Sequence, residues 1–403
     1  MIDSARRIPE PLFPSFPKEE FDWRYDRVRR FMDEAGIDLL VLTGRENVTY
    51  FSGLVNAAWI THGMVPGLIL FHKDRGEPMM ILPDFWLGTA EKTTWIQDLI
   101  LHRNTHSDPD DFAELVVRLA RSLDWDRGTI GYEAGKEMIL GMPIQQFDRI
   151  RQGLSGAEWA PGGDVIWKAR MVKSLLEVER LRRAAQITNR AQERLRDFLR
   201  PGMNELDAGR FVRMAQIEAG GSDQDRLFLN MRAAGPDRFN MTDSLPQDRP
   251  MNPGEVLIVD AGIYLEGYPS DTARCMVIGE PNSFQLSVYE KVIEALDAAL
   301  RTVRPGVRAS EVFQAVRQVY DAVGYPVHID MVGHGIGLDI HEPPMLSPLN
   351  DYLIEENMVL CIEPWVTFPD KQTVFTIEDT FWVTAGGYEQ LTLRNADQLW
   401  VVR

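Results

Sequence analysis

The sequence is poor in several features that would otherwise define its class. It contains only two cysteines in 403 residues, Cys275 and Cys361, which are too few for a disulfide framework or a thiolate zinc site. No segment approaches about 18 consecutive apolar residues, and the N-terminal segment lacks the apolar core of a secretory signal. We therefore expect no transmembrane helix, no membrane partner and a location in the reducing cytoplasm.

Positive charge is also scarce relative to negative charge. The chain has 43 Lys and Arg residues against 60 Asp and Glu residues, a formal net charge of −17 at pH 7. An acidic surface repels a phosphate backbone, so this balance argues against a nucleic-acid partner. Hydrophobic residues make up 44% of the chain and charged residues 26%, which is typical of a folded protein and excludes wholesale disorder.

The pattern of apolar residues changes near residue 165. Before it, short apolar runs alternate with amphipathic helical stretches, which predicts an α/β domain over residues 1–165. The segment APGGD at 160–164 has the composition of a hinge, and a long helical stretch follows it as far as Pro201–Gly202. We therefore predict a second, α+β domain over residues 166–403.

This second part contains an internal repeat. The segment 199–221 resembles 303–325, because each has an Arg-Pro-Gly turn followed by a helical pattern, and the two prolines lie 104 positions apart. The apolar run VLIVD ends at Asp260 and the run VLCIE ends at Glu363, 103 positions later. Two copies in the same register predict two halves related by a pseudo-two-fold axis.

The first copy carries two aspartates in apolar strands. Asp260 and Asp271 are separated by ten residues, in VLIVDAGIYLEGYPSDTAR. A two-residue turn at Leu265–Glu266 would place these two carboxylates opposite each other, on one face of a hairpin.

The second copy carries two glutamates in the same arrangement. Glu363 and Glu378 are separated by fourteen residues, which centres the predicted turn at Asp370–Lys371. Charged groups inside apolar strands are costly unless they are paired, and four carboxylates in one half-buried cluster cannot all stay ionised alone. If the two halves pack face to face, a pair of divalent cations would balance the four negative charges.

Two histidines lie between the two hairpins, in GHGIGLDIHEPP. His334 and His341 are seven positions apart, so on an extended run they would point to opposite faces unless the loop curls. We therefore expect one of them to be a metal ligand and the other to contact the substrate or another ligand.

These motifs resemble those of the pita-bread metallohydrolases, which include methionine aminopeptidase, prolidase, Xaa-Pro aminopeptidase and creatinase. The resemblance covers about residues 165–403, and the preceding part resembles the N-terminal domain of the prolidase and creatinase branches. The five metal ligands of the family correspond to residues that are all intact here: Asp260, Asp271, His334, Glu363 and Glu378. By this resemblance, Asp260 chelates one ion, Asp271 and Glu378 bridge both, and His334 with Glu363 completes the second.

The resemblance implies hydrolysis of an amide C–N bond, with a water activated at two divalent ions. The oxygen-rich ligand set suits Mn²⁺, Fe²⁺, Co²⁺ or Zn²⁺. It further implies that Glu363 is the general base and that His341 donates a hydrogen bond to the developing oxyanion. Arg274 and Asp379 have two open interpretations, since they either hold ligand carboxylates in place or form an ordinary surface ion pair.

The chain departs from the family pattern at one position. Asp243, in NMTDSLPQDRPMNPGE, stands where the family usually has a substrate-site histidine. It is either a pocket carboxylate that favours a cationic group or a solvated loop residue. In the N-terminal part, Trp59 and His62 are either core residues or, by resemblance to prolidases, contacts to the substrate of a partner in a homodimer.

Three hypotheses for the function follow. The leading one is a metal-dependent hydrolase that resembles Xaa-Pro dipeptidases or aminopeptidases and acts on a small peptide. The second is a hydrolase or lyase of the same fold that acts on a cationic or zwitterionic small molecule such as an amide or a betaine-like compound. The third is a non-catalytic binding module, which the intact ligand set disfavours.

Overall fold

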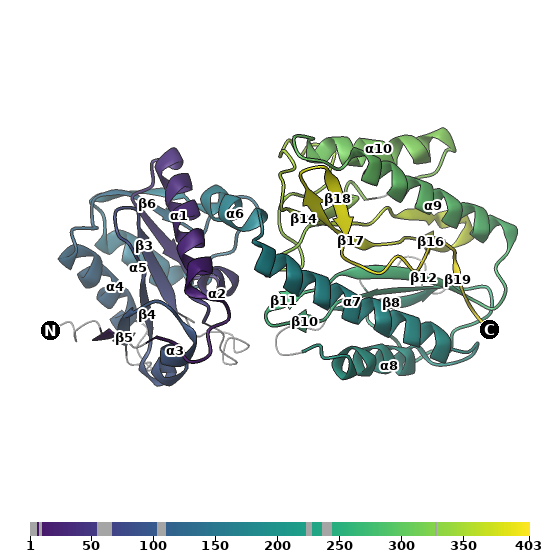
Figure 1. Cartoon of the computed structure of the whole chain (residues 1–403), viewed down its shortest axis with the longest axis horizontal. Helices are drawn as coiled ribbons and strands as arrows, with labels where there is room; N and C mark the ends of the chain where they lie inside the picture. Colours follow the sequence, from purple (N-terminus) through teal and green to yellow (C-terminus); the bar gives the residue numbers. More distant parts are fainter. Residues whose placement is uncertain are drawn as a thin grey trace. The chain divides into compact units, whose positions relative to one another are not determined.

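The computed structural model describes residues 6–7, 10–54, 67–102, 110–222, 228–235, 244–326 and 329–403 (Figure 1). Its contacts divide the chain into two compact units, Met1–Arg170 and Met171–Arg403, here called unit 1 and unit 2. Each unit has its own sheets and helices and is described by itself.

Unit 1 is an α/β unit built on one mixed sheet. Its strands are β1 (Arg6–Arg7), β2 (Leu39–Leu42), β3 (Leu68–His72), β4 (Met79–Pro83), β5 (Asp98–His102), β6 (Gly128–Tyr132) and β7 (Ala157–Pro161). Its helices are α1 (Lys18–Ala35), α2 (Arg45–Ser52), α3 (Leu87–Thr93), α4 (Asp110–Ser122), α5 (Ile144–Gly153) and α6 (Gly163–Met171). The strand order is β1-β5-β4-β3-β2-β6-β7. The buried apolar strands β2, β3 and β4 confirm the sequence pattern, because their side chains are covered on both faces.

Unit 2 contains two four-stranded sheets and two helix pairs. Its helices are α7 (Leu175–Phe198), α8 (Glu205–Glu218), α9 (Ser283–Thr302) and α10 (Ala309–Ala322). The first sheet has the order β19-β12-β9-β8, with β8 (Leu229–Ala234), β9 (Val256–Ala261), β12 (Thr272–Ile278) and β19 (Trp400–Val402). The second has the order β13-β14-β17-β18, with β13 (Gly333–Gly335), β14 (Val359–Ile362), β17 (Asp379–Thr384) and β18 (Gly387–Gln390). In Figure 1 the strands of this unit lie between the α7–α8 pair and the α9–α10 pair.

The order of these elements confirms the predicted repeat. Each half has a long helix, a turn, a second helix of 14 residues, and then a sheet that carries two of the carboxylates. The long helices both begin with a capping box, at Ser174 with Glu177 and at Asn282 with Gln285, so each start is fixed by side chains that bind the free backbone amides.

The two hairpins were predicted with different success. The strands β15 (Val366–Phe368) and β16 (Thr373–Phe375) pair Val366 with Phe375, so the turn is centred at Asp370–Lys371 as predicted. The prediction for the first hairpin was wrong.

In the first hairpin, β10 (Tyr264–Leu265) and β11 (Tyr268–Pro269) turn at Glu266–Gly267, one position later than expected. Glu266 and Gly267 both have positive φ angles, of 52° and 86°, which a two-residue hairpin turn of this kind requires and which Gly267 adopts without strain. As a result Asp260 lies opposite Ala273 and not opposite Asp271. Asp271 is two residues before Ala273, so it keeps the same face and becomes a diagonal neighbour of Asp260.

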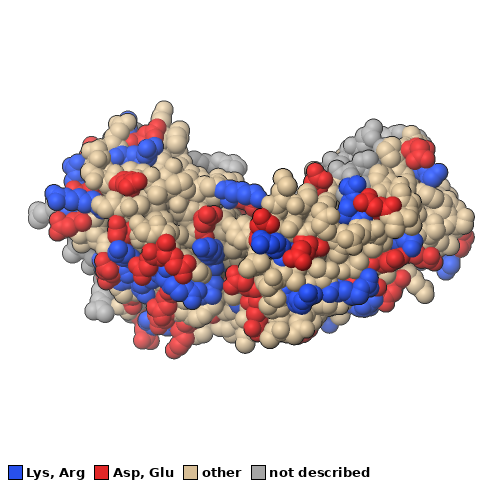
Figure 2. All heavy atoms as spheres, turned by 90° about the horizontal axis from the view of Figure 1, so that it is seen from above, with Lys and Arg blue, Asp and Glu red and all other residues tan. Residues whose placement is uncertain are grey.

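Two further expectations concern the acidic surface and the absence of a transmembrane helix. On the face shown in Figure 2, Lys and Arg residues are interspersed with Asp and Glu residues, so the net negative charge does not form one acidic field there. Among the described residues, no helix combines the length and the apolar character needed to cross a bilayer.

Candidate metal centre

The four carboxylates reach the centre from the ends of paired strands. Asp260 is on β9, and Asp271 directly precedes β12, its antiparallel neighbour. Glu363 directly follows β14 and Glu378 directly precedes β17, and these antiparallel strands pair Ile362 with Asp379, so Glu363 and Glu378 lie opposite each other. Oxygen atoms of Asp260, Asp271 and Glu378 lie within 4.8 Å of one another. The two sheets therefore bring together the charged residues that end their apolar strands.

His334 lies in the middle of β13 and is fully buried. Its Nε2 atom is 3.7 Å from Asp271 Oδ2, 3.6 Å from Glu363 Oε1 and 3.7 Å from Glu378 Oε1. Its Nδ1 atom is 3.0 Å from the carbonyl oxygen of Gly335, which can only accept a hydrogen bond. Nδ1 therefore donates this hydrogen bond, and Nε2 is the ring nitrogen that faces the carboxylates.

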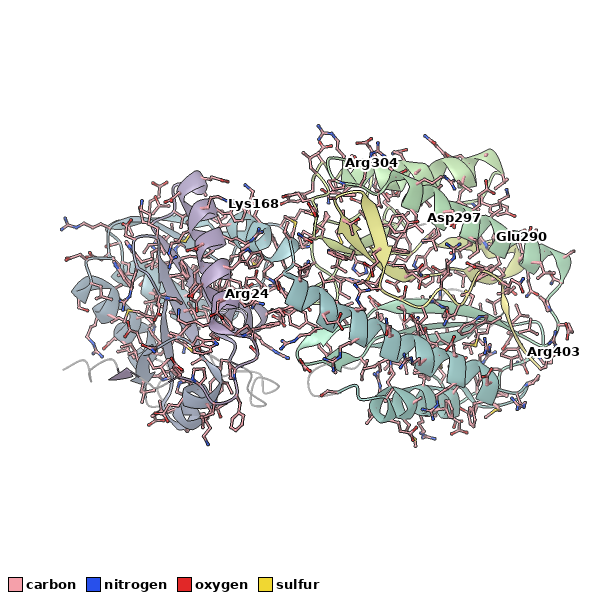
Figure 3. All side chains as sticks on the ribbon, viewed as in Figure 1. Arg24, Lys168, Glu290, Asp297, Arg304 and Arg403 are labelled. Carbon is pink, nitrogen blue, oxygen red and sulfur yellow. The ribbon has the colours of Figure 1, made fainter. Side chains whose placement is uncertain are left out.

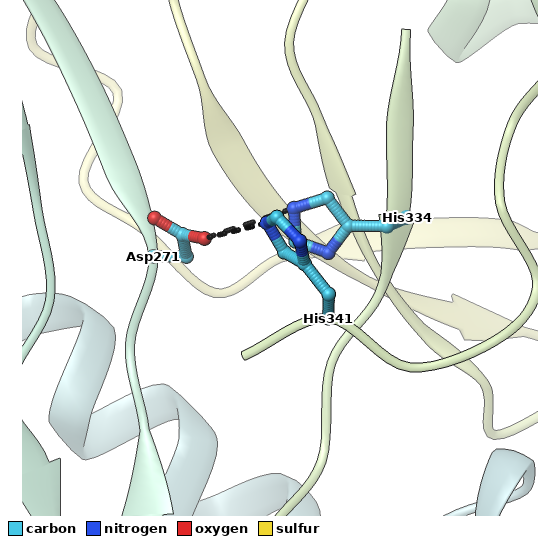
Figure 4. Close-up of side chains that lie close together, drawn as sticks. All are labelled: Asp271, His334 and His341. Carbon is cyan, nitrogen blue, oxygen red and sulfur yellow. Dashed lines mark ion pairs between the residues drawn. The ribbon is translucent and has the colours of Figure 1, made fainter. Parts of the chain in front are cut away.

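His341 reaches the same place because the glycine-rich loop curls back. Gly335 forms an isolated β-bridge with Glu342, and the Glu342 amide donates to the Gly335 carbonyl oxygen at 2.8 Å. The rings of His334 and His341 are 4.1 Å apart, and His341 Nε2 is 4.0 Å from Asp271 Oδ2 (Figure 4). The two histidines differ in exposure, since His334 is buried whereas the His341 side chain is 54% exposed. The buried His334 is therefore suited to bind a metal, and the exposed His341 is accessible to a substrate.

Several polar atoms of this cluster have no hydrogen-bond partner among the described residues. They are Asp260 Oδ1, Asp271 Oδ1, His334 Nε2, and both carboxylate oxygens of Glu378. Burial, together with the charges of neighbouring carboxylates, raises the pKa of Asp260, Asp271 and Glu378 well above the ordinary range. Divalent cations bind carboxylate oxygens and imidazole nitrogens, so this set of buried atoms without hydrogen-bond partners fits a metal centre.

The interpretation of Arg274 and Asp379 as an ordinary surface pair does not fit their burial. Arg274 is fully buried and its Nη2 is 2.7 Å from Asp379 Oδ1. Arg274 Nη1 donates to the carbonyl oxygen of Glu378 at 2.7 Å, and Arg274 Nε donates to Asn395 Oδ1 at 3.0 Å. The guanidinium thus binds the backbone of Glu378. Its charge acts to lower the pKa of the Glu378 carboxylate, but neither carboxylate oxygen accepts a hydrogen bond from it, and burial with the neighbouring carboxylates still raises that pKa.

The geometry can be compared with known proteins. The chain matches metallopeptidase family M24 over residues 179–385 and the creatinase/prolidase N-terminal domain over residues 24–172. The chain belongs to metallopeptidase family M24. As an M24 protein it is a metal-dependent hydrolase, and its C-terminal part has the pita-bread fold of the resemblance.

Relatives match this M24 protein over most of its length. The probable dipeptidase PepE of Mycobacterium tuberculosis is 35% identical over 369 residues, which cover 88% of this chain and 89% of that protein. The Xaa-Pro dipeptidase of Pyrococcus furiosus is 27% identical over 370 residues, covering 92% and 97% respectively. The crystal structure of dipeptidase PepE from Mycobacterium ulcerans superposes with a TM-score of 0.81 at 26% identity and covers 96% of this chain and 99% of that one.

Three of the predicted site residues cannot be placed. Trp59, His62 and Asp243 lie outside the described residues of the M24 protein. Their proposed contacts to substrate remain predictions from the sequence.

The structure also adds residues that the sequence reasoning missed. Trp365 donates its indole N–H to Glu363 Oε2 at 2.8 Å. Glu342, next to His341, forms a fully buried ion pair with Lys173 at 3.3 Å. The thiol of Cys361 lies 3.7 Å from the hydroxyl of Thr380, close to His334 and Glu378. Trp365 lies two positions after Glu363 and Glu342 stands inside the quoted motif GHGIGLDIHEPP, whereas nothing in the sequence around Lys173 indicated its partner.

Proposed function

We propose that this M24 protein is a dipeptidase that removes the N-terminal residue from Xaa-Pro dipeptides, with two divalent ions held by Asp260, Asp271, His334, Glu363 and Glu378. The observation that carries the proposal is the cluster of buried carboxylate oxygens around His334 Nε2, which, like this nitrogen, have no hydrogen-bond partner among the described residues. The relatives named Xaa-Pro dipeptidase and dipeptidase PepE support the substrate class. When bound, the ions would supply Lewis-acid activation of water and of the scissile carbonyl.

The side chains of the centre have separate tasks in this proposal. Glu363 directs Oε1 toward the cluster, 3.6 Å from His334 Nε2, where it can accept the proton of the attacking water. His341 is exposed on the same side and can donate a hydrogen bond to the carbonyl oxygen as negative charge develops there. Arg274 fixes the backbone of Glu378 and so holds that carboxylate against the cluster.

The direct test is turnover by protein that has been stripped of metal and then reloaded with Mn²⁺, Co²⁺, Fe²⁺ or Zn²⁺ one at a time. Xaa-Pro dipeptides should be cleaved only after metal is returned, and Xaa-Pro tripeptides more slowly. Matched controls are an Xaa-Ala dipeptide, which tests the proline, and an N-acetylated Xaa-Pro dipeptide, which tests the free amine.

Two results would contradict the proposal. Equal turnover of tripeptides and dipeptides would indicate an aminopeptidase. Metal-loaded protein that cleaves no peptide but converts a cationic amide or betaine-like compound would instead establish the second hypothesis and direct attention to Asp243.

The assembly is proposed from the resemblance alone. A homodimer would allow Trp59 and His62 of one chain to approach the substrate of the other. Sedimentation equilibrium should give twice the mass of 45.9 kDa. A monomeric mass in an active preparation would remove this part of the proposal.

A further inference from the structure

The indole of Trp365, two residues after Glu363, lies against the Glu363 carboxylate. Trp365 Nε1 is 2.8 Å from Glu363 Oε2. An indole N–H can only donate, so the carboxylate must be the acceptor. Hydrogen bonds to an ionised acceptor are roughly twice as strong as those between neutral groups. By comparison, the Asn230 amide reaches Asp260 Oδ2 at 3.4 Å, and neither oxygen of Glu378 has a donor among the described residues.

The backbone around Trp365 is held on both sides. The carbonyl oxygen of Pro364 accepts a hydrogen bond from the buried hydroxyl of Tyr320 at 3.3 Å. Val366 begins β15 and pairs with Phe375 across the hairpin. The amide of Glu363 itself donates to the Val332 carbonyl oxygen at 2.9 Å. These contacts fix the backbone on both sides of the indole.

This contact makes the two oxygens of Glu363 unequal. Oε2 is bound to the indole, whereas Oε1 lies 3.6 Å from His334 Nε2 in the centre. A carboxylate that is free to rotate exchanges its two oxygens, but this one cannot do so without losing the hydrogen bond. We propose that Trp365 is a positioning residue that fixes the Glu363 carboxylate, so that Oε1 alone serves the metal centre and the reaction. This inference rests on the proposed function, because it assigns Glu363 to that centre.

The test compares two tryptophans of unit 2. Trp365→Phe keeps an aromatic ring and removes the N–H. The matched control is Trp382→Phe, because Trp382 is similarly half-buried and donates to Asn357 Oδ1 at 3.0 Å, a contact that involves none of the proposed ligands. Loss of a hydrogen-bonding partner of a metal ligand typically costs about 10–100-fold in metal affinity or activity. We expect Trp365→Phe to lose that much in kcat and in Zn²⁺ affinity, measured by calorimetric titration, with little change in KM. Trp382→Phe should match the unmodified protein.

A measurement on the unmodified protein guards against a variant that fails to fold. With ¹⁵N-labelled tryptophan, addition of Zn²⁺ should shift one indole N–H resonance strongly, and that resonance should be absent from Trp365→Phe. Unmodified protein that binds Zn²⁺ with no indole shift, or Trp365→Phe with unchanged Zn²⁺ affinity and kcat, would overturn the inference while leaving the proposed function intact. Unmodified protein that binds no metal and cleaves no dipeptide would overturn both.

Discussion

Glu133 in unit 1 and Glu378 in unit 2 are both buried, but their carboxylates have opposite surroundings. Glu133 accepts hydrogen bonds from the amides of Thr43 and Gly44, from the Asn47 side chain at 2.7 Å, and from the Thr43 hydroxyl. Thr43 and Gly44 directly precede α2, so the carboxylate also lies at the positive end of a helix. Neither oxygen of Glu378 has such a donor among the described residues.

The buried ion pair of Arg24 and Glu20 in unit 1 follows the pattern of Glu133. Arg24, labelled in Figure 3, is buried on α1, pairs with Glu20 at 2.8 Å and donates to the Tyr50 carbonyl oxygen at 2.6 Å. Burial of a carboxylate is thus not in itself a sign of function. A buried carboxylate that lacks donors and faces other carboxylates is such a sign, because only a cation or a proton can compensate it.

The largest expected effect follows from replacing Glu378. In Glu378→Gln one negative charge and one ligand oxygen of the centre are lost, while the size of the side chain is kept. We expect kcat on an Xaa-Pro dipeptide to fall by more than about 100-fold. Loss of a residue that only hydrogen-bonds to a metal ligand costs up to about 100-fold, and loss of a ligand itself should cost more. Metal analysis of the purified variant should show fewer ions per chain. Full activity with full metal content would show that Glu378, like Glu133, is not required for metal binding.

Removal of metal should change how stability depends on pH. Because the pKa values of Asp260, Asp271 and Glu378 are raised in the folded state, these groups favour folding while protonated and lose that contribution as the pH rises from the unfolded carboxyl pKa through the folded one. Each such group costs up to about 1.4 kcal/mol per pH unit in that interval. Urea unfolding in the presence of a chelator should therefore give a free energy of unfolding that decreases from weakly acidic to neutral pH. Saturating Mn²⁺ should remove most of this decrease, and a flat profile without metal would argue against the cluster.

Replacement of Glu133 should affect stability and leave the chemistry unchanged. In Glu133→Gln the new amide group faces the donors of Thr43, Gly44 and Asn47, so at least one buried donor loses its acceptor. We expect a loss of about 1–3 kcal/mol in the free energy of unfolding, measured in urea. Metal content and kcat should equal those of the unmodified protein. A drop in metal content would show that Glu133 is not purely structural.

The smallest effect is expected for an exposed carboxylate. Glu389 pairs with Arg182 at 2.6 Å, but its side chain is 48% exposed. Glu389→Gln should change the free energy of unfolding by less than about 1 kcal/mol, because solvent screens the pair. A larger loss would indicate that the pair belongs to a network that orders α7 and β18.

The sequence could predict those features of the fold and the site that follow from regular spacing of residues. The repeat and the turn at Asp370–Lys371 follow from apolar strands that end in a carboxylate, and the structure confirms both. The turn after Asp260 was misplaced by one residue, because the symmetric count ignored the preference of Gly267 for positive φ.

Contacts that depend on loop geometry could not be predicted in this way. The approach of His341 to His334 requires the bridge between Gly335 and Glu342, which no periodicity encodes. The pair of Lys173 with Glu342 joins residues 169 positions apart, which no local pattern indicates. Such contacts are set by tertiary packing and not by local preference.

The most direct test of the central claim is to count the divalent ions that metal-stripped protein takes up while its activity on an Xaa-Pro dipeptide is followed. The cluster of unpartnered carboxylates predicts that activity appears only with bound metal and levels off near two ions per chain. Full activity in the presence of a chelator, with no ion bound, would contradict the account.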